Sequence, residues 1–235
     1  DRRIRKLANA LVDLGVAKGD RVGVIGWNTY RQFEMYFAVG GIGAVLHTIN
    51  PRLGPENAAF VINHAEDDYL FYDTTFAPLV AALKPHLKSV KQYCLLTDSE
   101  HAGEAGKGAL LYEDLVAGAA EAFDWPDFDE NTAVAMCYTS GTTGDPKGVV
   151  YSHRALVLQA FAAGLPSSLG LKEGDVLLPV VPMFHVNAWG VPFSGPMAGA
   201  KLVMPGPNLD GASLHALFEA EGVTCTAAIP AGHQL

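Results

Sequence analysis

Ile4-Arg-Lys-Leu-Ala-Asn-Ala-Leu-Val-Asp-Leu14 repeats apolar side chains at helical spacing, and the chain then turns at Gly15 and Gly19 into the apolar run Val22-Gly-Val-Ile-Gly26. This pattern predicts a helix that leads into a buried strand. We expect further helices at 33–39, 55–64 and 76–83, and strands at 43–47, 69–72 and 90–96. Because these strands are short and do not alternate apolar with polar residues, they favour a parallel sheet covered on both faces. The expected fold class is α/β.

A change in composition divides the chain near its middle. Gly, Glu and Lys are the dominant residues of 97–108 and show no periodicity, which predicts a surface segment. Residues 126–131 are rich in acids and precede the apolar strand 133–138. We therefore predict two α/β subdomains, 1–128 and 129–235.

Composition limits the functions to consider. The 235 residues carry 16 Lys+Arg against 25 Asp+Glu, a formal charge of -9, without a long basic run, so nucleic acid is not expected as a partner. The 3 cysteines are far apart and lack zinc-site spacing, which fits a cytoplasmic protein. No apolar stretch approaches the roughly 20 residues of a membrane-spanning helix. Because the chain begins at Asp1 without Met, we expect it to be part of a longer protein.

A loop rich in hydroxyls and glycines follows the strand 133–138. It reads Thr139-Ser-Gly-Thr-Thr-Gly-Asp-Pro-Lys-Gly148, and is followed by an apolar strand at 149–151 and by Ser152, a good N-cap for a helix at 155–163. Glycines let backbone N–H groups approach an anion, hydroxyls offer donors and metal contacts, and a lysine adds a mobile positive charge. The loop therefore predicts a triphosphate-binding site. Its candidate phosphate-binding residues are Thr139, Ser140, Gly141, Thr142, Thr143, Gly144 and Lys147.

Other motifs with similar composition fit less well. A Walker A loop requires GxxxxGK[ST], whereas Lys147 follows Pro146 and precedes Gly148. Gly41-Ile-Gly43 lacks the third glycine of a dinucleotide fingerprint, and no GxSxG nucleophile elbow occurs. A solvated turn between two strands accounts for any three of the loop residues, although not for the whole string. A domain whose loop binds inorganic anions only is a further alternative.

The string Tyr138-Thr-Ser-Gly-Thr-Thr-Gly-Asp-Pro-Lys-Gly-Val149 resembles the AMP-binding signature of the adenylate-forming superfamily, which contains acyl-CoA synthetases, luciferases and adenylation domains of peptide synthetases. Further segments fit this family in order, namely Gly19-Asp-Arg-Val22, Asn50-Pro-Arg52, Ser152-His-Arg154 and Val181-Pro-Met-Phe-His-Val-Asn-Ala-Trp-Gly190. The last segment is most similar to bacterial medium- and long-chain fatty-acyl-CoA ligases. The resemblance implies two stacked αβαβα subdomains of the family's large N-terminal domain.

The resemblance also implies a chemistry. In such enzymes a carboxylate attacks the α-phosphate of Mg-ATP to give an acyl-adenylate and pyrophosphate, and the thiol of CoA then displaces AMP. ATP, CoA and a small carboxylic acid would be the substrates, with Mg²⁺ as cofactor and Thr139 as a metal ligand. His185 would be the catalytic residue beside the α-phosphate and the reacting carboxylate.

The resemblance implies that four of the residues that follow His185 contact the acyl group. Trp189 resembles the aromatic gate of a fatty-acid tunnel, and Val186, Ala188 and Val191 would line the acyl pocket. An ordinary core position is the alternative for both His185 and Trp189. Residues 229–234 depart from the family pattern, so the resemblance does not carry over to the tunnel wall beyond Pro230.

Parts of the family's machinery are expected to lie outside this chain. The resemblance places the ribose-binding Asp, the hinge and the small C-terminal domain with its catalytic lysine after Leu235. We therefore expect the fragment alone to complete neither half-reaction. A ligase for a short or alkylthio-substituted acid, and a non-catalytic nucleotide-binding or dimerisation module, remain as alternatives. The resemblance favours a homodimer, and an apolar substrate leaves peripheral membrane contact open.

Overall fold

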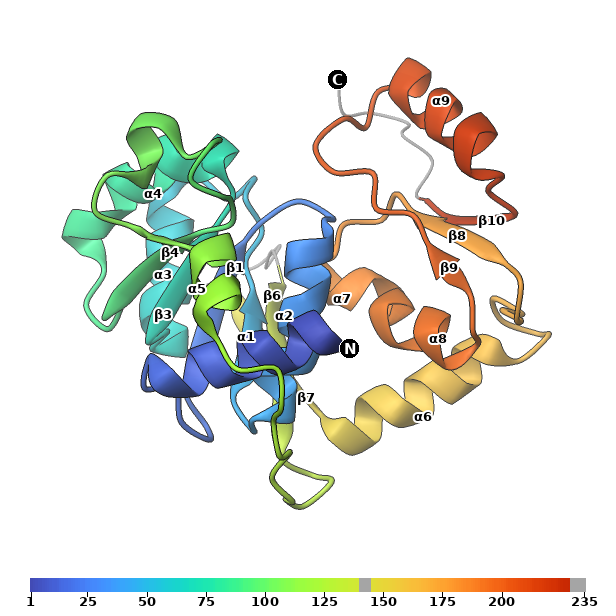
Figure 1. The fold of residues 1–235 in the computed structure, drawn as a ribbon, viewed down its shortest axis with the longest axis horizontal. Coiled ribbons are helices and arrows are strands. Elements are labelled where there is room, and N and C mark those ends of the chain that lie inside the picture. Colours follow the sequence, from blue (N-terminus) through green and yellow to red (C-terminus); the bar gives the residue numbers. More distant parts are fainter. Residues whose placement is uncertain (140–144, 229–235) are drawn as a thin grey trace. The chain divides into compact units, whose positions relative to one another are not determined.

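The computed structural model describes residues 1–139 and 145–228 (Figure 1). The chain forms two compact units, one made of Asp1–Gly26 and Arg31–Arg154 and the other of Trp27–Tyr30 and Ala155–Leu235. Ser140 to Gly144, which belong to the predicted phosphate loop, and residues 229–234 lie outside the described residues. Within the described ranges, no helix has both the length and the apolar character needed to cross a bilayer.

A seven-stranded sheet in the order β5-β4-β3-β1-β2-β6-β7 is the centre of the first unit. All of its neighbouring strands are parallel except β6 and β7, which form an antiparallel pair at one edge. The carboxyl ends of β1, β2, β3 and β6 therefore reach the same edge of the sheet, where ligands bind in open α/β folds. The strands are β1 (Arg21–Ile25), β2 (Val45–Thr48), β3 (Tyr69–Tyr72), β4 (Gln92–Leu95), β5 (Leu110–Leu111), β6 (Ala133–Thr139) and β7 (Lys147–Ser152).

Helices cover both faces of this sheet. One face packs against α3 and α4, and the other against α1, α2 and α5. On the second face, the Arg3 guanidinium joins the three helices by donating to the carboxylates of Glu34 and Glu113. The helices are α1 (Arg2–Asp13), α2 (Tyr30–Gly41), α3 (Pro55–Ala65), α4 (Ala77–Leu83) and α5 (Tyr112–Gly118), with short 3-10 helices at Thr74–Phe76, Lys84–His86 and Gly103–Gly106.

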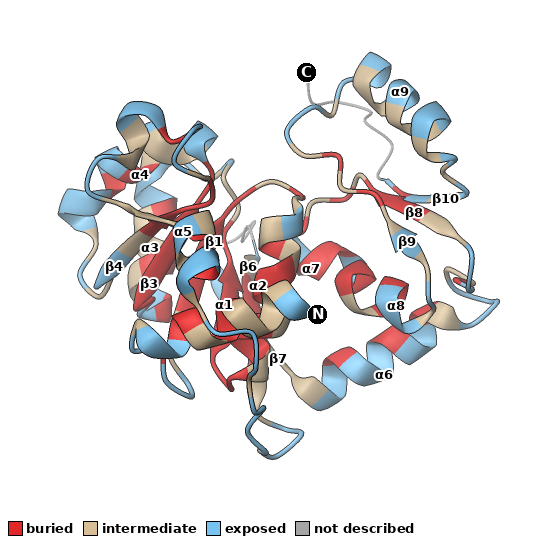
Figure 2. Ribbon diagram, viewed as in Figure 1, coloured by how far each residue is buried: buried red, intermediate tan, exposed pale blue. Residues whose placement is uncertain are grey.

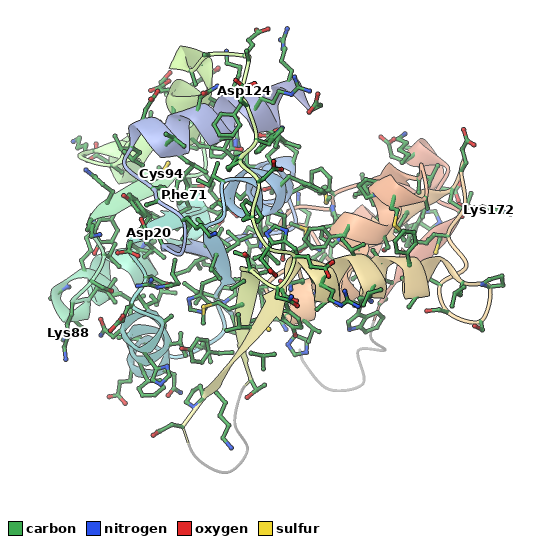
Figure 3. The ribbon with its side chains drawn as sticks, turned by 90° about the horizontal axis from the view of Figure 1, so that it is seen from below. Asp20, Phe71, Lys88, Cys94, Asp124 and Lys172 are labelled. Atoms are coloured by element: carbon green, nitrogen blue, oxygen red, sulfur yellow. The ribbon has the colours of Figure 1, made fainter. Side chains whose placement is uncertain are left out.

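The core of the first unit lies on the two faces of the sheet (Figure 2). Alternate residues of each strand face opposite helical layers, so Phe71 and Leu70 are both fully buried although they point to different sides. Phe71 pairs with Cys94 across β3 and β4, and Figure 3 shows both in the interior while Lys88 lies at the outer edge. This two-sided burial explains why the strands read as continuous apolar runs.

The second unit contains a three-stranded parallel sheet in the order β10-β8-β9. Its fully buried residues include Leu177 and Leu178 of β8. Its strands are β8 (Val176–Pro179), β9 (Lys201–Leu202) and β10 (Cys225–Ala227), and its helical segments are α6 (His153–Gly164), α7 (Val186–Trp189), α8 (Val191–Met197) and α9 (Gly211–Glu221).

The α/β class is confirmed, and strand β3 coincides with the predicted range 69–72. The compact units divide after Arg154, whereas the sequence places the change of subdomain at residues 128 and 129. The physical reason is strand pairing, because β6 pairs with β2 and β7 pairs with β6. These pairings hold residues 133–152 in the first sheet.

Candidate functional site

The predicted phosphate loop connects β6 to β7. These strands pair antiparallel up to Thr139 and Lys147, which face each other where the described strands end. The Thr139 hydroxyl donates a long hydrogen bond of 3.5 Å to the Lys147 carbonyl. Both side chains are exposed. The hairpin therefore presents one hydroxyl and one ammonium group side by side at the two ends of the loop.

Aromatic and imidazole rings pack around the last residues of β6 before the loop. The His64 ring on α3 lies 2.7 Å from the Tyr138 hydroxyl through its Nδ1 atom, and Phe60 stacks on His64 with ring centroids 5.4 Å apart. The Tyr138 ring also lies 5.1 Å from the His47 ring. Burial, together with the charge of Asp67, raises the pKa of Tyr138 to about 12, so its phenol stays protonated at neutral pH.

A fully buried pair lies next to Tyr138. The Nδ1 atom of His47 on β2 lies 2.7 and 3.0 Å from the two carboxylate oxygens of Asp67, which follows α3. Both side chains are 0% exposed. Burial raises the pKa of Asp67, and the neighbouring His47 opposes that shift. A small cavity of about 10 Å³ lies beside His47, and it is lined by Thr48, Ile49, Asn50, Leu53, Val61, Tyr138, Thr139 and Pro146.

In the second unit, Asn28 holds the segment that leads to His185. Its side-chain amide donates to the carbonyls of Pro179 and Val181, both at 2.9 Å, and its side-chain oxygen accepts from the Met183 N–H at 2.7 Å. All of these bonds are buried. The backbone that leads to His185 is therefore fixed by one side chain, Asn28, which uses both its amide N–H donors and its carbonyl acceptor.

The backbone after His185 forms a left-handed turn. Val186, Asn187, Ala188, Trp189 and Gly190 have φ angles of 47°, 49°, 47°, 58° and 77°. This region is costly for residues other than Gly, most of all for a β-branched one such as Val186. Gln159 of α6 donates from Nε2 to the Trp189 carbonyl at 2.8 Å, which holds the end of the turn. Strain of this kind is often found at functional sites.

The turn separates the predicted acyl-contact residues into two groups. Val186 and Trp189 are 38% and 37% exposed, and His185 is also exposed. Ala188 and Val191 are fully buried in the second unit. Thr139 and Lys147 belong to the first unit, so the predicted phosphate-binding and acyl-contact residues are each described within their own unit. The predicted roles of these residues stay predictions.

The residues at the hairpin fit a magnesium ion as far as they are described. Mg²⁺ takes oxygen ligands and usually combines one or two protein groups with water and phosphate oxygens. The exposed Thr139 hydroxyl supplies such an oxygen, and its long bond to the Lys147 carbonyl is weak enough to be replaced.

Sequence reasoning missed Asn28, His47, His64 and Asp67. Each lies in a segment that reads as an ordinary end of a strand or helix. A signal was present at His47, because a lone histidine in a continuous apolar strand needs a polar partner when it is buried. Asp67 lies 20 residues away, and only the sheet register brings it to His47.

Comparisons with known proteins agree with this architecture. A family model described as "AMP-binding enzyme" matches residues 1–235. A medium-chain-fatty-acid–CoA ligase from Ectopseudomonas oleovorans is 50% identical over 97% of this chain, and a 3-methylmercaptopropionyl-CoA ligase from Ruegeria pomeroyi is 48% identical over 96%. The chain spans 42% of the length of each of these relatives.

A solved structure shares the fold. The crystal structure of a putative long-chain-fatty-acid CoA ligase from Rhodopseudomonas palustris superposes with a TM-score of 0.83 at 28% identity, covering 97% of this chain and 55% of that one. Because the family model matches residues 1–235, the chain belongs to the AMP-binding enzyme family.

Proposed function

We propose that the protein containing this chain joins a carboxylic acid to CoA at the expense of ATP. A carboxylate oxygen attacks the α-phosphorus of ATP, the bond to pyrophosphate breaks, and an acyl-adenylate forms. The thiol of CoA then loses its proton and attacks the acyl carbonyl, and AMP leaves. The observation that carries the proposal is the hairpin at which Thr139 faces Lys147 across a loop of glycines and hydroxyls. Family membership and the names of the relatives support it.

The residues of this chain act by positioning and by charge. The first half-reaction brings an anion to an anion, so its barrier falls when positive charge and N–H donors face the phosphates. Lys147, exposed beside the loop, neutralises the β- and γ-phosphates, and Thr139 offers a hydroxyl to the metal. Mg²⁺ when bound supplies charge that stabilises the developing pyrophosphate. His185 orients the reacting carboxylate, and Val186, Ala188, Trp189 and Val191 contact the acyl chain.

The proposed acid is a medium- or long-chain fatty acid. Support comes from the 50% identical medium-chain ligase and from the exposed apolar side chains of Val186 and Trp189. A second candidate is a short or alkylthio-substituted acid, since a 3-methylmercaptopropionyl-CoA ligase is 48% identical over nearly the same span. We also propose a cytoplasmic homodimer that acts in fatty-acid metabolism and touches membranes only peripherally.

The test measures pyrophosphate release by the full-length protein with Mg-ATP, without CoA, across a ladder of carboxylic acids. We expect release to peak at one chain length, and to fall on the order of a hundredfold in Lys147→Ala. Lys88→Ala is the matched control, because Lys88 is an exposed lysine at the outer edge of the first unit. A peak at alkylthio-propionate would select the second candidate. Acid-independent release, or none, would refute the ligase assignment in favour of a nucleotide-binding module.

A further inference from the structure

The His47–Asp67 pair has no part in the roles above, although it lies directly beside the strand that enters the phosphate loop. We propose that His47, held by Asp67, is a positioning residue for the nucleotide, and that its Nε2 atom binds one ordered water molecule that supports Tyr138 and Thr139. This inference rests on the proposed function, because it assigns the support of the same phosphate site.

The His47–Asp67 pair is built into the fold. His47 on β2 is in register with Gly23 on β1 and with Met136 on β6. A Cβ atom at Gly23 would lie 2.9 Å from the Asp67 carboxylate, closer than packed side chains allow. Glycine in this central strand therefore leaves the space that the carboxylate occupies. The fold therefore keeps a buried carboxyl group beside the central strand, where an apolar side chain would cost less.

The other nitrogen of the His47 ring also needs a hydrogen-bond partner. With Nδ1 turned to Asp67, Nε2 is the remaining polar atom of His47, and it is buried without a hydrogen-bond partner among the described residues. Nε2 carries either a lone pair or a proton, and buried polar atoms of both kinds are nearly always hydrogen-bonded. Water satisfies either form because it both donates and accepts.

A small space lies beside His47. His47 lines the cavity of about 10 Å³, which is room for about one water molecule. Asn50, Tyr138 and Thr139 line the same cavity. These residues carry polar groups, and a buried water molecule requires such partners. The remaining walls are mostly apolar, so the water would be confined to this position.

Strand β6, which enters the phosphate loop, connects this site to the nucleotide. Tyr138 is held from two sides, by the 2.7 Å contact of its hydroxyl with His64 and by its packing on the His47 ring. Thr139 comes next and lines the cavity. A shift of the His47 ring moves the strand from which the phosphate loop starts, so the pair acts on ATP through backbone placement.

A direct test does not depend on activity. A crystal structure of the full-length protein, at a resolution that shows ordered solvent, should contain a water molecule within hydrogen-bond distance of His47 Nε2 and of one polar atom of Asn50, Tyr138 or Thr139. A dry cavity, or a direct bond from Nε2 to a protein atom, would overturn the proposal. Because this test involves no turnover, it stands even where the ligase assignment fails.

The kinetic test uses His47→Asn, whose amide nitrogen takes the place of Nδ1 toward Asp67 and which removes Nε2 together with the rest of the ring that packs on Tyr138. We expect the KM for ATP in acid-dependent pyrophosphate release to rise about tenfold, with the KM for the acid unchanged. His101→Asn is the matched control, because the exposed His101 makes the same Nδ1 contact with Asp98 at 2.7 Å but lies at the surface. His47→Gln, whose longer amide reaches the position of Nε2, should restore much of the affinity for ATP.

A purely structural role predicts a different result. In that case His47→Asn would lower the midpoint of unfolding while the KM for ATP stays at the wild-type value, and the proposal would be wrong. If His47→Asn does not fold, His47→Gln is compared with the wild type instead. A normal KM for ATP in this variant, together with a water molecule at its side-chain amide, supports the proposal. The same variant with a dry cavity contradicts it.

Discussion

The hairpin neck at Thr139 and Lys147 and the segment 182–190 carry the two halves of the proposed chemistry, but they are held in different ways. The neck is regular antiparallel backbone, and its side chains are exposed at strand ends. The segment around His185 leaves regular structure, enters a left-handed turn and is held by the side chains of Asn28 and Gln159. In the proposed mechanism, side chains at strand ends are enough to bring positive charge to the phosphates. Orienting the acid instead calls for a backbone that is strained and fixed by its neighbours.

Within the segment 182–190, the largest effect is expected at His185, which is proposed to orient the reacting carboxylate. His185→Ala should lower acid-dependent pyrophosphate release on the order of a hundredfold and leave the free energy of unfolding nearly unchanged, since the side chain is exposed. His215→Ala, at an exposed histidine of α9, should retain wild-type activity. Equal loss in both variants would remove His185 from the proposed mechanism.

Asn28 tests whether side-chain support keeps the segment in place. Asn28→Ala leaves the carbonyls of Pro179 and Val181 and the Met183 N–H without their buried partner, so we expect a loss of about 2–3 kcal/mol in the free energy of unfolding. Denaturant titration measures this loss. Asn131→Ala, at an exposed asparagine of the first unit, should cost much less. Comparable costs would show that the Asn28 bonds contribute little.

Two glycine substitutions compare the backbone of the left-handed turn with the backbone of the hairpin neck. Gly190→Ala places a Cβ atom 2.0 Å from the Gln159 side-chain oxygen at a φ of +77°, and should cost about 1–2 kcal/mol in the free energy of unfolding. Gly148→Ala brings a Cβ atom no closer than 3.2 Å to the Tyr138 ring, and should change stability by about 0.5 kcal/mol or less. Adding Gln159→Ala to Gly190→Ala should recover the steric part of the loss. Equal costs at both glycines would contradict the contrast between the two regions.

These contrasts also separate what the sequence could predict from what it could not. Short apolar runs such as Tyr69–Tyr72 determine strands locally, so the α/β alternation was predictable. The phosphate-binding role of the loop after β6 has a chemical reason in its composition, and it stays a prediction. The partners of Asn28 lie more than 150 residues away, and no local pattern encodes such contacts. The left-handed turn contradicts the local preferences of Val186 and Trp189, so tertiary packing must impose it.

Long-range strand pairing also determines the position of the unit boundary. The acid-rich residues 126–131 look like a linker, and composition alone favours a division there. The following strand instead completes the first sheet, because β6 pairs in parallel with β2 through Leu46 and Ala135. Strand pairing is a long-range property, and the apolar character of residues 133–138 is equally compatible with either sheet.

The smallest expected effect is a pH dependence at His153, where the first unit ends and α6 begins. Its half-buried ring packs on Phe128 with centroids 4.9 Å apart, and burial lowers the pKa of His153 below its usual 6.5. The unfolded chain then binds this proton more tightly than the folded protein, so stability falls as the pH drops below about 6.5. Denaturant titrations between neutral and mildly acidic pH should show a smaller pH-dependent loss for His153→Gln than for the wild type. Because the ring is only half-buried, the difference is expected to be small, and an identical pH slope in both proteins would show that His153 keeps its ordinary proton affinity in the folded state.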